Sequence, residues 1–449
     1  MTRTEAAFVE KVRTKQLTVA VIGLGYVGLP LAVEFARAGV RVLGIDVNVP
    51  RVAAINRGES HIPDVPSEKL APLVQAGCFR AGTAYSDCAD ADAVVICVPT
   101  PFTKMKAPDL SYIEAACQAL APHVAPGSLV VLQSTTYPGT TEELVRPLLE
   151  ATGRQAGRDF LLAFSPERID PGNKQFGAHN TPKVVGGIDA ASCEAACALF
   201  ALLVPPAQIH RVSSPRVAEM CKLLENIFRS VNIALVNELA KLCYRMEIDI
   251  WEVIDAAATK PFGFMPFYPG PGVGGHCIPV DPYYLSWKAR EYDFYTKFIE
   301  LAAEVNSSMP FFTVNRIAEA LNRRGKPLSG ARILVLGAAF KRDIDDPRNA
   351  PALEVMKALL AQGAEVCYHD PHIPEVHLDG DHDPRTGPGR ILTSVPLTAA
   401  LLVAQDCVCL AVAHSAFDLP WLVQHSRLLV DATGATRRLP HDRNTVIRL

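Results

Sequence analysis

The sequence predicts an α/β protein in which two doubly wound units are joined by a long central helix and a helical middle domain. Short apolar runs bounded by turn residues recur up to residue 212 at the spacing of parallel strands with crossover helices. A second series of such runs follows residue 311. Between the two series lies a helical stretch, residues 214–248, much of which is apolar on most sides. The predicted domains are residues 1–212, 213–310 and 311–449.

Composition and charge are those of an ordinary globular chain. Its 449 residues fit roughly two or three domains, and a net charge of −3 without a basic block argues against nucleic acid as a partner. No apolar run approaches the roughly 20 residues that cross a bilayer, and the start of the chain lacks the apolar segment of a signal peptide. The twelve cysteines are scattered without a C-x-x-C pair. We therefore expect a cytoplasmic protein with reduced thiols, no membrane insertion and no bound metal.

The first domain opens with a dinucleotide-binding pattern. A buried strand at residues 17–22 runs into a turn, a helix at 29–38 and a second strand at 41–45. The turn consists of Gly23, Leu24, Gly25, Tyr26, Val27 and Gly28. This G-x-G-x-x-G spacing lets a pyrophosphate approach the helix N-terminus, as in Rossmann domains. Asp46, at the end of the second strand, would bind the ribose hydroxyls and repel a 2′-phosphate, which predicts NAD as cofactor, although the nearby Arg51 would oppose that selection.

Polar residues follow three further strands predicted within residues 92–164. Ligands bind at the carboxyl ends of strands in open α/β sheets, so these residues are candidate site residues. They are Thr100, Ser134, Thr135, Thr136 and Glu167. For the hydroxyl residues the alternative is capping of the next helix, by Thr136 or Thr140. The strand-end position of Glu167 favours a functional role, whereas Arg168 beside it has the alternative of a plain surface ion pair.

The central helix combines an apolar surface with two polar residues on one face. It opens at Pro215, a residue favoured in the first helical turn. Lys222 and Asn226 lie one turn apart, and a lysine in a buried helix is costly unless it is paired or used. The alternative is a solvated lysine near the helix start. Residues 227–242 are apolar around most of the circumference, which predicts a homodimer or a larger closed assembly, with packing between domains as the alternative.

A glycine-rich stretch, residues 268–282, presents a single cysteine. Its glycines allow a ligand to approach the backbone, and its prolines limit movement. The candidate residues here are Tyr268, Gly270, Gly272, Gly274 and Gly275. Cys277 follows them as a candidate nucleophile, and the Asp281 carboxylate comes four residues later. The alternative is a surface loop with an incidental cysteine, and we expect His276 to be structural because neighbouring loop residues usually point apart.

The third domain is a smaller doubly wound unit without a G-x-G-x-x-G turn. Its predicted strands are residues 331–337, 365–369, 408–411 and 428–431. The first of these is followed by Phe340 and Lys341, then by an acidic loop that contains Arg348. Residues 373–390 are rich in His, Asp, Pro and Gly and are predicted to be a mobile loop. Three histidines in and beside it lack a regular ligand spacing, so we expect solvated surface and no metal site: His372, His377 and His382.

The order of these features resembles a known family along nearly the whole chain. A G-x-G-x-x-G turn is followed by a long helix with Lys222 and Asn226 and then by the Gly-Gly-His-Cys-Ile-Pro-Val-Asp run at residues 274–281. The last domain opens with Phe340 and Lys341. This arrangement is similar to that of the nucleotide-sugar 6-dehydrogenases of the UDP-glucose/GDP-mannose dehydrogenase family, which oxidise UDP-sugars twice to UDP-uronic acids.

Two stretches point to one branch of that family. Residues 165–173 and 267–272 resemble the UDP-N-acetylglucosamine 6-dehydrogenases of bacterial surface-polysaccharide pathways. Pro171 stands where the UDP-glucose enzymes usually have a second glutamate, and Pro261 stands in place of an arginine. After Asp431 the chain reads Ala-Thr-Gly-Ala, where the group often has Thr-Arg-Asn. The partner at that end of the nucleotide site is therefore unassigned.

The resemblance implies roles for the candidate residues. Cys277 would be the nucleophile, Lys222 and Asn226 would stabilise the alkoxide, and proton transfer and hydrolysis would use Asp281, Glu167 and a water held by Thr135. The expected NAD contacts are Gly23 to Gly28, Asp46, Arg51, Thr100, Ser134, Thr135 and Arg348. The expected UDP-sugar contacts are Glu167, Arg168, Lys222, Asn226, Tyr268, Gly270, Gly272, Gly274, Gly275, Phe340 and Lys341.

The expected substrate is UDP-N-acetylglucosamine, and three alternatives remain. The same oxidation of UDP-glucose, UDP-N-acetylgalactosamine or UDP-N-acetylmannosamine would use the same residues. A two-electron hydroxyacid dehydrogenase would share the first domain but would need neither Cys277 nor the last α/β domain. A non-catalytic NAD-binding sensor would not need the set formed by Cys277, Lys222, Asn226 and Asp281.

Overall fold

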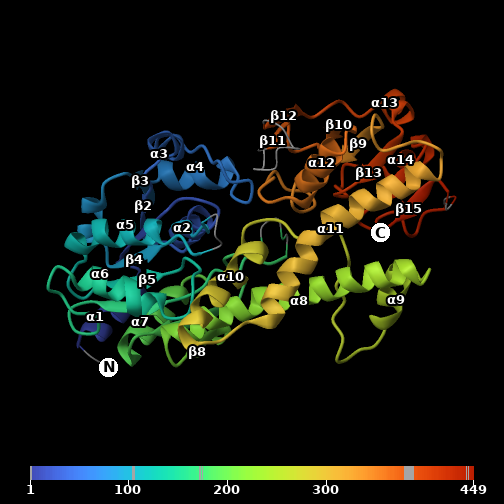
Figure 1. Ribbon diagram of the computed structural model, residues 1–449. Coiled ribbons are helices and arrows are strands. Elements are labelled where there is room, and N and C mark those ends of the chain that lie inside the picture. The colour runs from blue at the N-terminus through green and yellow to red at the C-terminus, as the bar shows by residue number, and fades with distance from the viewer. Residues whose placement is uncertain are drawn as a thin grey trace. The chain divides into compact units, whose positions relative to one another are not determined.

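The computed structural model describes residues 3–103, 107–170, 173, 175–378, 389–440, 442 and 444–449 (Figure 1). The chain forms two compact units. The first unit contains the residues up to Glu225 together with Tyr283–Phe294, and the second contains Asn226–Pro282 and Tyr295–Leu449. Both are built on parallel sheets, so the predicted α/β class is confirmed. No helix in the described ranges is long and apolar enough to cross a membrane.

The first unit is built on an eight-stranded sheet with the order β3-β2-β1-β4-β5-β6-β7-β8. Neighbouring strands are parallel except for the pair β6 and β7. The strands are β1 (Thr18–Ile22), β2 (Arg41–Ile45), β3 (Phe79–Gly82), β4 (Ala93–Ile96), β5 (Leu129–Leu132), β6 (Leu161–Phe164), β7 (Lys183–Gly187) and β8 (Ile209–Val212). The order reverses direction at β1, with β2 on one side and β4 on the other, and this is the position at which doubly wound sheets bind ligands.

Helices cover both faces of this sheet. Val19 and Val21 of β1 belong to one apolar cluster with residues of α1, α2 and α7, while Ala20 and Ile22 belong to another with residues of α5 and α6. This alternation follows from the two-residue period of a strand. The α-helices are α1 (Arg3–Arg13), α2 (Gly28–Arg37), α3 (Val49–Asn56), α4 (Ser67–Gln75), α5 (Ser111–Leu120), α6 (Arg146–Glu150) and α7 (Ala190–Phe200). Shorter turns are η1 (Tyr85–Asp90), η2 (Ala121–His123), η3 (Thr141–Val145) and η4 (Pro206–Gln208).

The second unit has a five-stranded parallel sheet with the order β10-β9-β13-β14-β15. The strands are β9 (Arg332–Leu336), β10 (Glu365–His369), β13 (Cys407–Leu410), β14 (Leu429–Asp431) and β15 (Val446–Arg448). Ile333 and Val335 pack with residues of α11 and α12, whereas Leu334 and Leu336 pack with residues of α13 and α14. The helices are α9 (Ile250–Ala257), α11 (Lys297–Asn322), α12 (Pro351–Ala361), α13 (Ala399–Ala404) and α14 (Leu419–His425).

The prediction of a mobile loop at residues 373–390 is wrong in part. Strands β11 (Glu375–Leu378) and β12 (Arg390–Thr393) form an antiparallel pair. The sequence signal was masked by composition, because His377 occupies an exposed position between the buried Val376 and Leu378. That alternation is the pattern of a half-buried strand. His382 lies outside the described residues.

The central helix α8 (Pro215–Arg245) is continuous, as predicted, and ends three residues earlier than expected. Its apolar residues are not all buried within the chain. Phe228, Leu235, Leu239 and Leu242 are between 38% and 53% exposed. Their spacing of three, four or seven residues places them along one side of the helix, and we call them the α8 stripe.

The helices after the glycine-rich stretch differ from those predicted. The sequence pattern predicts a loop up to residue 282, one helix over residues 283–309 and another over residues 312–323. Instead α10 (Cys277–Ala289) begins at the cysteine itself, continues into η5 (Arg290–Tyr292), and is separated from α11 by Asp293 with φ +52°. The early start is compatible with Pro279, because the first-turn N–H groups of a helix have no partner within it.

Candidate active site

The turn after β1 has the shape that a dinucleotide needs. Gly23 has φ +89°, and a Cβ on Gly28 would lie 1.8 Å from the Gly23 carbonyl oxygen. Glycine is therefore required at both positions for α2 to begin directly behind the strand. A Cβ on Gly25 would meet no atom within 4 Å, so this part of the backbone is open to an approaching group. The arrangement fits a pyrophosphate at a helix N-terminus.

Asp46 is buried at the end of β2 and binds the same turn. One carboxylate oxygen accepts a hydrogen bond from the Leu24 N–H at 2.9 Å, and the other accepts from the Asn48 N–H at 2.9 Å. The Arg51 guanidinium lies 2.9 Å from the first oxygen. Asp46 and Arg51, both predicted to contact NAD, thus form an ion pair at the end of the dinucleotide-binding pattern that faces the ribose.

Glu167 follows β6 and is held by a buried network. Its carboxylate accepts hydrogen bonds from the Gln133 amide at 2.7 Å and from the backbone N–H groups of Arg168 and Ile169 at 2.7 and 3.0 Å. The Lys183 ammonium of β7, whose side chain is fully buried, lies 3.1 Å away. Burial alone would raise the pKa of Glu167, but Lys183 and the backbone donors outweigh it and lower that pKa. Glu167 is therefore a carboxylate fixed in position.

Sequence reasoning missed Lys183 and Gln133. The signal for Lys183 was present, since a lysine that opens a strand whose other residues are apolar or glycine would be buried and would need a partner. The identity of that partner was not visible, because Glu167 lies sixteen residues away in the sequence.

The hydroxyl residues after β5 do not cap the following helix. Glu219 of α8 provides this contact instead, because its carboxylate accepts from the Gly139 and Thr141 N–H groups at 2.5 and 2.9 Å. The predicted cap Thr140 donates to the Tyr137 carbonyl. The Thr136 hydroxyl is buried and has no hydrogen-bond partner in the described structure.

The remaining hydroxyl candidates differ in their contacts. Ser134 donates to the Val98 carbonyl at 2.7 Å. The side chain of Thr135 is half-buried and makes no hydrogen bond to any described residue. Thr100 is buried, and its carbonyl accepts from the Tyr284 hydroxyl. Among these candidates, Thr135 has a hydroxyl available to hold a water.

Arg168 and Lys222, the two cations of the first unit that are expected at the substrate, differ in their surroundings. Arg168 forms an ion pair with Glu225 at 2.6 Å and donates to the Pro182 carbonyl at 2.9 Å. Lys222 of α8 is buried, yet it has no ion pair or hydrogen bond within the described ranges. A buried lysine is costly without a partner, which favours a role in binding a ligand.

In the second unit the predicted nucleophile lies at a helix start. Cys277 is the first residue of α10 and is exposed. Asp281 lies one turn later on the same side of the helix and is buried. Asn226 of α8 donates from its amide to the Asp281 carboxylate at 2.6 Å. The unpaired N–H groups of a first helical turn stabilise negative charge, so this position favours a thiolate.

The glycine stretch packs on the segment that follows β9. A Cβ on Gly274 would lie 2.7 Å from the Phe340 side chain, and Gly275, with φ +81°, lies against the same ring. The Gly275 N–H donates to the Arg348 carbonyl at 3.0 Å, and the Asn349 amide donates to the Gly275 carbonyl at 3.0 Å. The structure thus brings the predicted glycines together with Phe340 and Arg348.

Other candidates of this unit lie around that segment. Gly270 donates its N–H to Asn237 at 3.1 Å, and Tyr268 donates its hydroxyl to Asp255 at 2.7 Å. Gly272 has φ +139°. Lys341 is half-buried. The Arg348 guanidinium pairs with Asp346 at 2.6 Å.

His276 is half-buried beside Arg348. Burial lowers the pKa of His276, and the charge of Arg348 lowers it further. The imidazole is therefore neutral near pH 7.

Comparison with known proteins identifies the family. Sequence models of the UDP-glucose/GDP-mannose dehydrogenase family match residues 17–204 (NAD binding domain), 216–308 (central domain) and 334–438 (UDP binding domain). The chain belongs to this family. It is therefore an oxidoreductase that uses NAD to oxidise a nucleotide sugar.

Relatives of this dehydrogenase act on several N-acetylated sugars. The chain is 37% identical to a UDP-N-acetyl-D-glucosamine 6-dehydrogenase of Pseudomonas aeruginosa, over 90% of this chain and 92% of the relative. It is 38% identical to an NDP-N-acetyl-D-galactosaminuronic acid dehydrogenase of Ralstonia nicotianae, over 93% and 96%. The solved UDP-D-ManNAc dehydrogenase of Pyrococcus horikoshii is similar with a TM-score of 0.85 and 31% identity, over 96% of this chain and 99% of that one.

The nicotinamide cofactor expected for this dehydrogenase fits the residues present. The NAD-binding region of the family match contains the open backbone at Gly25, the required glycines at 23 and 28, and the carboxylate of Asp46. Pro171, on which the substrate expectation rests in part, lies outside the described residues.

Proposed function

We propose that this dehydrogenase oxidises the C6 alcohol of UDP-N-acetylglucosamine to the uronic acid through a thioester on Cys277, for bacterial surface-polysaccharide synthesis in the cytoplasm. The observation that carries the proposal is the arrangement at the start of α10. Cys277 occupies the first helical position, and the Asp281 carboxylate one turn later is fixed by the Asn226 amide at 2.6 Å. A simple alcohol dehydrogenase has no use for a cysteine in such a position.

Each oxidation step assigns a task to residues of this chain. Two NAD molecules, bound one after the other, would each accept one hydride in the two successive oxidations. In the first oxidation, the C6 hydroxyl loses its proton and the C6 carbon loses a hydride. Lys222 stabilises the negative charge that develops on the oxygen. The Cys277 thiolate then adds to the aldehyde carbon and forms a thiohemiacetal, whose oxygen is stabilised in the same way. Loss of the second hydride and the hydroxyl proton leaves a thioester.

Hydrolysis releases the acid and restores Cys277. Water adds to the thioester carbonyl, the C–S bond breaks, and the thiolate leaves. The water is held by the Thr135 hydroxyl, which makes no hydrogen bond to a described residue. Asp281 and the ionised Glu167 provide negative charge for proton transfer, and the network around Glu167 keeps it ionised at neutral pH.

The choice of an N-acetylated sugar has two supports. The relatives reported above carry names of enzymes for N-acetylated sugars. In addition, the sequence has Pro171 where UDP-glucose enzymes usually have a second glutamate, and residues 165–173 resemble the UDP-N-acetylglucosamine branch. If the site hydrogen-bonds the acetamido group at C2, UDP-glucose would leave a buried polar atom unpaired, at a cost of about 1–3 kcal/mol.

Parallel measurements of NADH formation test the substrate. We expect a specificity constant for UDP-N-acetylglucosamine that is roughly tenfold to a hundredfold above that for UDP-glucose. UDP-N-acetylgalactosamine and UDP-N-acetylmannosamine should be tested in the same series. Preference for either of these would keep the acetamido argument and correct the stereochemistry, whereas equal or higher activity with UDP-glucose would overturn the assignment.

The assembly that we infer is a homodimer or a larger closed oligomer with α8 at its interface. The support is the α8 stripe, whose leucine and phenylalanine side chains are up to 53% exposed in the single chain. A contiguous apolar strip on a helix is commonly covered by a partner, and a second copy covers it symmetrically.

A further inference from the structure

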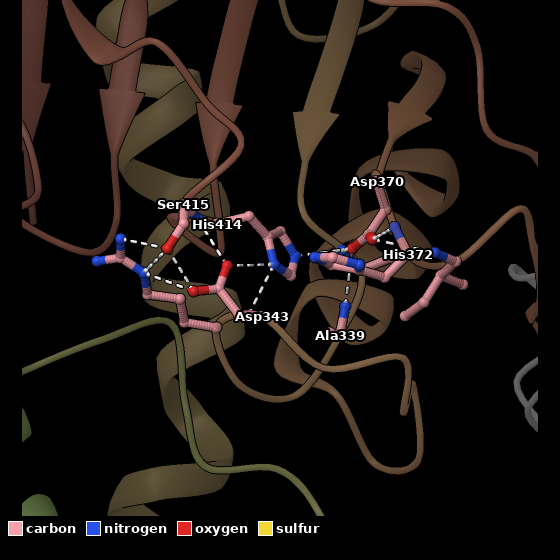
Figure 2. Close-up of polar contacts among 9 residues, drawn as sticks. Ala339, Asp343, Asp370, His372, His414 and Ser415 are labelled. Atoms are coloured by element: carbon pink, nitrogen blue, oxygen red, sulfur yellow. Dashed lines mark hydrogen bonds and ion pairs between the residues drawn. The ribbon is translucent and has the colours of Figure 1, made fainter. Parts of the chain in front are cut away.

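A buried histidine, His414, connects three segments of the second unit (Figure 2). It follows β13, while Asp370 follows β10 and Asp343 lies in the loop after β9. All three strands are parallel, so their carboxyl ends meet at one edge of the sheet. The loop after β9 also carries Phe340 and Lys341, the segment expected to contact the nucleotide sugar.

On one side His414 contacts Asp370. The His414 Nε2 lies 3.0 Å from the Asp370 Oδ2, and that oxygen also accepts from the Ala338 and Ala339 N–H groups at 2.6 and 3.2 Å. The other oxygen accepts from the His372 N–H at 2.8 Å. Burial would raise the pKa of Asp370, but these donors lower it to about 2. Asp370 is therefore a fixed anion that holds the beginning of the loop after β9.

On the other side His414 contacts the loop near Lys341. The Asp343 N–H donates to the His414 Nδ1 at 2.9 Å. Because Nδ1 accepts, Nε2 carries the hydrogen and the ring is the neutral tautomer. The Asp343 residue has φ +60°, a conformation that is uncommon for a residue with a side chain. Its carboxylate accepts from the Ser415 N–H at 2.6 Å, so two adjacent residues, His414 and Ser415, hold this turn.

The same loop supports the glycine stretch before Cys277. The Phe340 N–H donates to the Asp346 carbonyl at 3.0 Å, and the Phe340 ring lies against Gly274 and Gly275. We call residues 341–343 of this loop the Lys341 turn. A displacement of the Lys341 turn would therefore move the backbone just before the reactive cysteine.

Metal binding is the alternative for these side chains. Ligand atoms of Asp343, His372 and His414 lie within 4.8 Å of one another. The His414 lone pair, however, already accepts the Asp343 N–H at 2.9 Å, and its other nitrogen donates to Asp370. A metal would have to break the first of these bonds, so the observed arrangement favours a clamp on the loop.

We propose that His414 is a positioning residue that holds the Lys341 turn in the shape that binds the nucleotide sugar. It acts through its bond to the Asp343 N–H and touches no substrate itself. This inference rests on the proposed function and on the contact between Lys341 and the UDP-sugar that the family resemblance implies.

Two substitutions of His414 separate its two contacts. In His414→Asn the amide oxygen occupies the place of Nδ1 and can still accept from Asp343, while the contact to Asp370 is lost. In His414→Gln the amide nitrogen occupies the place of Nε2 and can still donate to Asp370, while the Asp343 N–H loses its acceptor. We expect the KM for the UDP-sugar and the Kd for UDP to be about tenfold higher in His414→Gln than in His414→Asn, with the KM for NAD alike in both.

Two further variants change exposed side chains, so they test the proposal without altering the buried His414 itself. Ser415→Ala removes an exposed hydroxyl that bonds the Asp343 carboxylate, and we expect it to raise the KM for the UDP-sugar about threefold. His372→Ala removes the exposed ring of the metal alternative, and we expect no change in that KM.

The outcomes distinguish the proposals. Equal UDP-sugar KM values for His414→Gln and His414→Asn, or wild-type values for Ser415→Ala, would overturn the positioning role in an enzyme that still oxidises UDP-sugars. Loss of activity with EDTA that zinc restores in the wild type but not in His372→Ala would overturn it in favour of a metal site. A wild type that neither binds UDP nor oxidises a UDP-sugar would remove the proposed function and this inference together.

Discussion

Replacing Lys183 by methionine tests the buried network that fixes Glu167. The two side chains are 0% and 8% exposed and lie 3.1 Å apart. Removal of one partner of a buried pair costs about 3–5 kcal/mol, because the other charge is left uncompensated. Glu167 would keep its bonds from Gln133, Arg168 and Ile169, which favours the lower end, about 3 kcal/mol. For a unit of this size the loss corresponds to a thermal midpoint lowered by roughly 6–12 °C.

The effect should depend on pH in a defined direction. In the wild type the pKa of Glu167 is lowered, so its contribution to stability is present above its unfolded value of about 4.3 and is lost as pH falls through the lower folded value. Without Lys183, fewer interactions counter the tendency of burial to raise the pKa of Glu167, so this pKa rises. The variant can then relieve the cost by taking up a proton. The destabilisation should therefore be larger at pH 8.5 than at pH 5.5.

Scanning calorimetry of wild type and variant at both pH values measures this, with the first transition as the readout. Glu167→Gln with Lys183→Met is the matched control, because it removes both charges and should recover part of the lost stability. Equal midpoint losses at the two pH values, together with additive effects in the double variant, would refute the electrostatic account of this pair.

Three further predictions concern cofactor, chemistry and assembly. Asp46→Ala should weaken NAD binding and release Arg51 for a 2′-phosphate, so the NAD to NADP ratio of kcat/KM should fall; a wild type that uses both cofactors equally would contradict this. Cys277→Ser should slow uronic acid formation by at least about a hundredfold because serine is scarcely ionised, while Cys277→Ala should still form some aldehyde; wild-type acid production in either would remove the cysteine from the mechanism. Leu235→Lys in the α8 stripe should shift the sedimentation mass from oligomer to monomer, and a monomeric wild type at micromolar concentration would contradict the assembly.

The parts of the structure that local pattern determines were predictable. The β1 turn with Gly23 and Gly28 and the acid at position 46 follow from a short run of sequence, and the structure places them as expected. The same holds for the α8 helix, because its proline start and its continuous helical pattern lie in one uninterrupted stretch of sequence. Strand β3 (Phe79–Gly82) was missed because its Arg80 and Gly82 interrupt the continuous apolar run that made the equally short β4, β5 and β6 recognisable.

The contacts that define the candidate site were less accessible because they join distant segments. Asn226 and Asp281 are 55 residues apart, and the Glu219 contact to Thr141 spans 78. The helical start at Cys277 was concealed by the surrounding prolines and glycines, which are common both in loops and in first helical turns. Local propensity identifies such residues as candidates, and tertiary packing alone decides their partners.

The number of NADH molecules formed per nucleotide sugar consumed tests the central claim most directly. Complete conversion of a limiting amount of UDP-N-acetylglucosamine with excess NAD should give two NADH and one uronic acid, because the Cys277 adduct passes through both oxidations before water releases it. A yield of one NADH, with the sugar recovered as an aldehyde or a ketone, would contradict the thioester mechanism and leave a simple alcohol dehydrogenase.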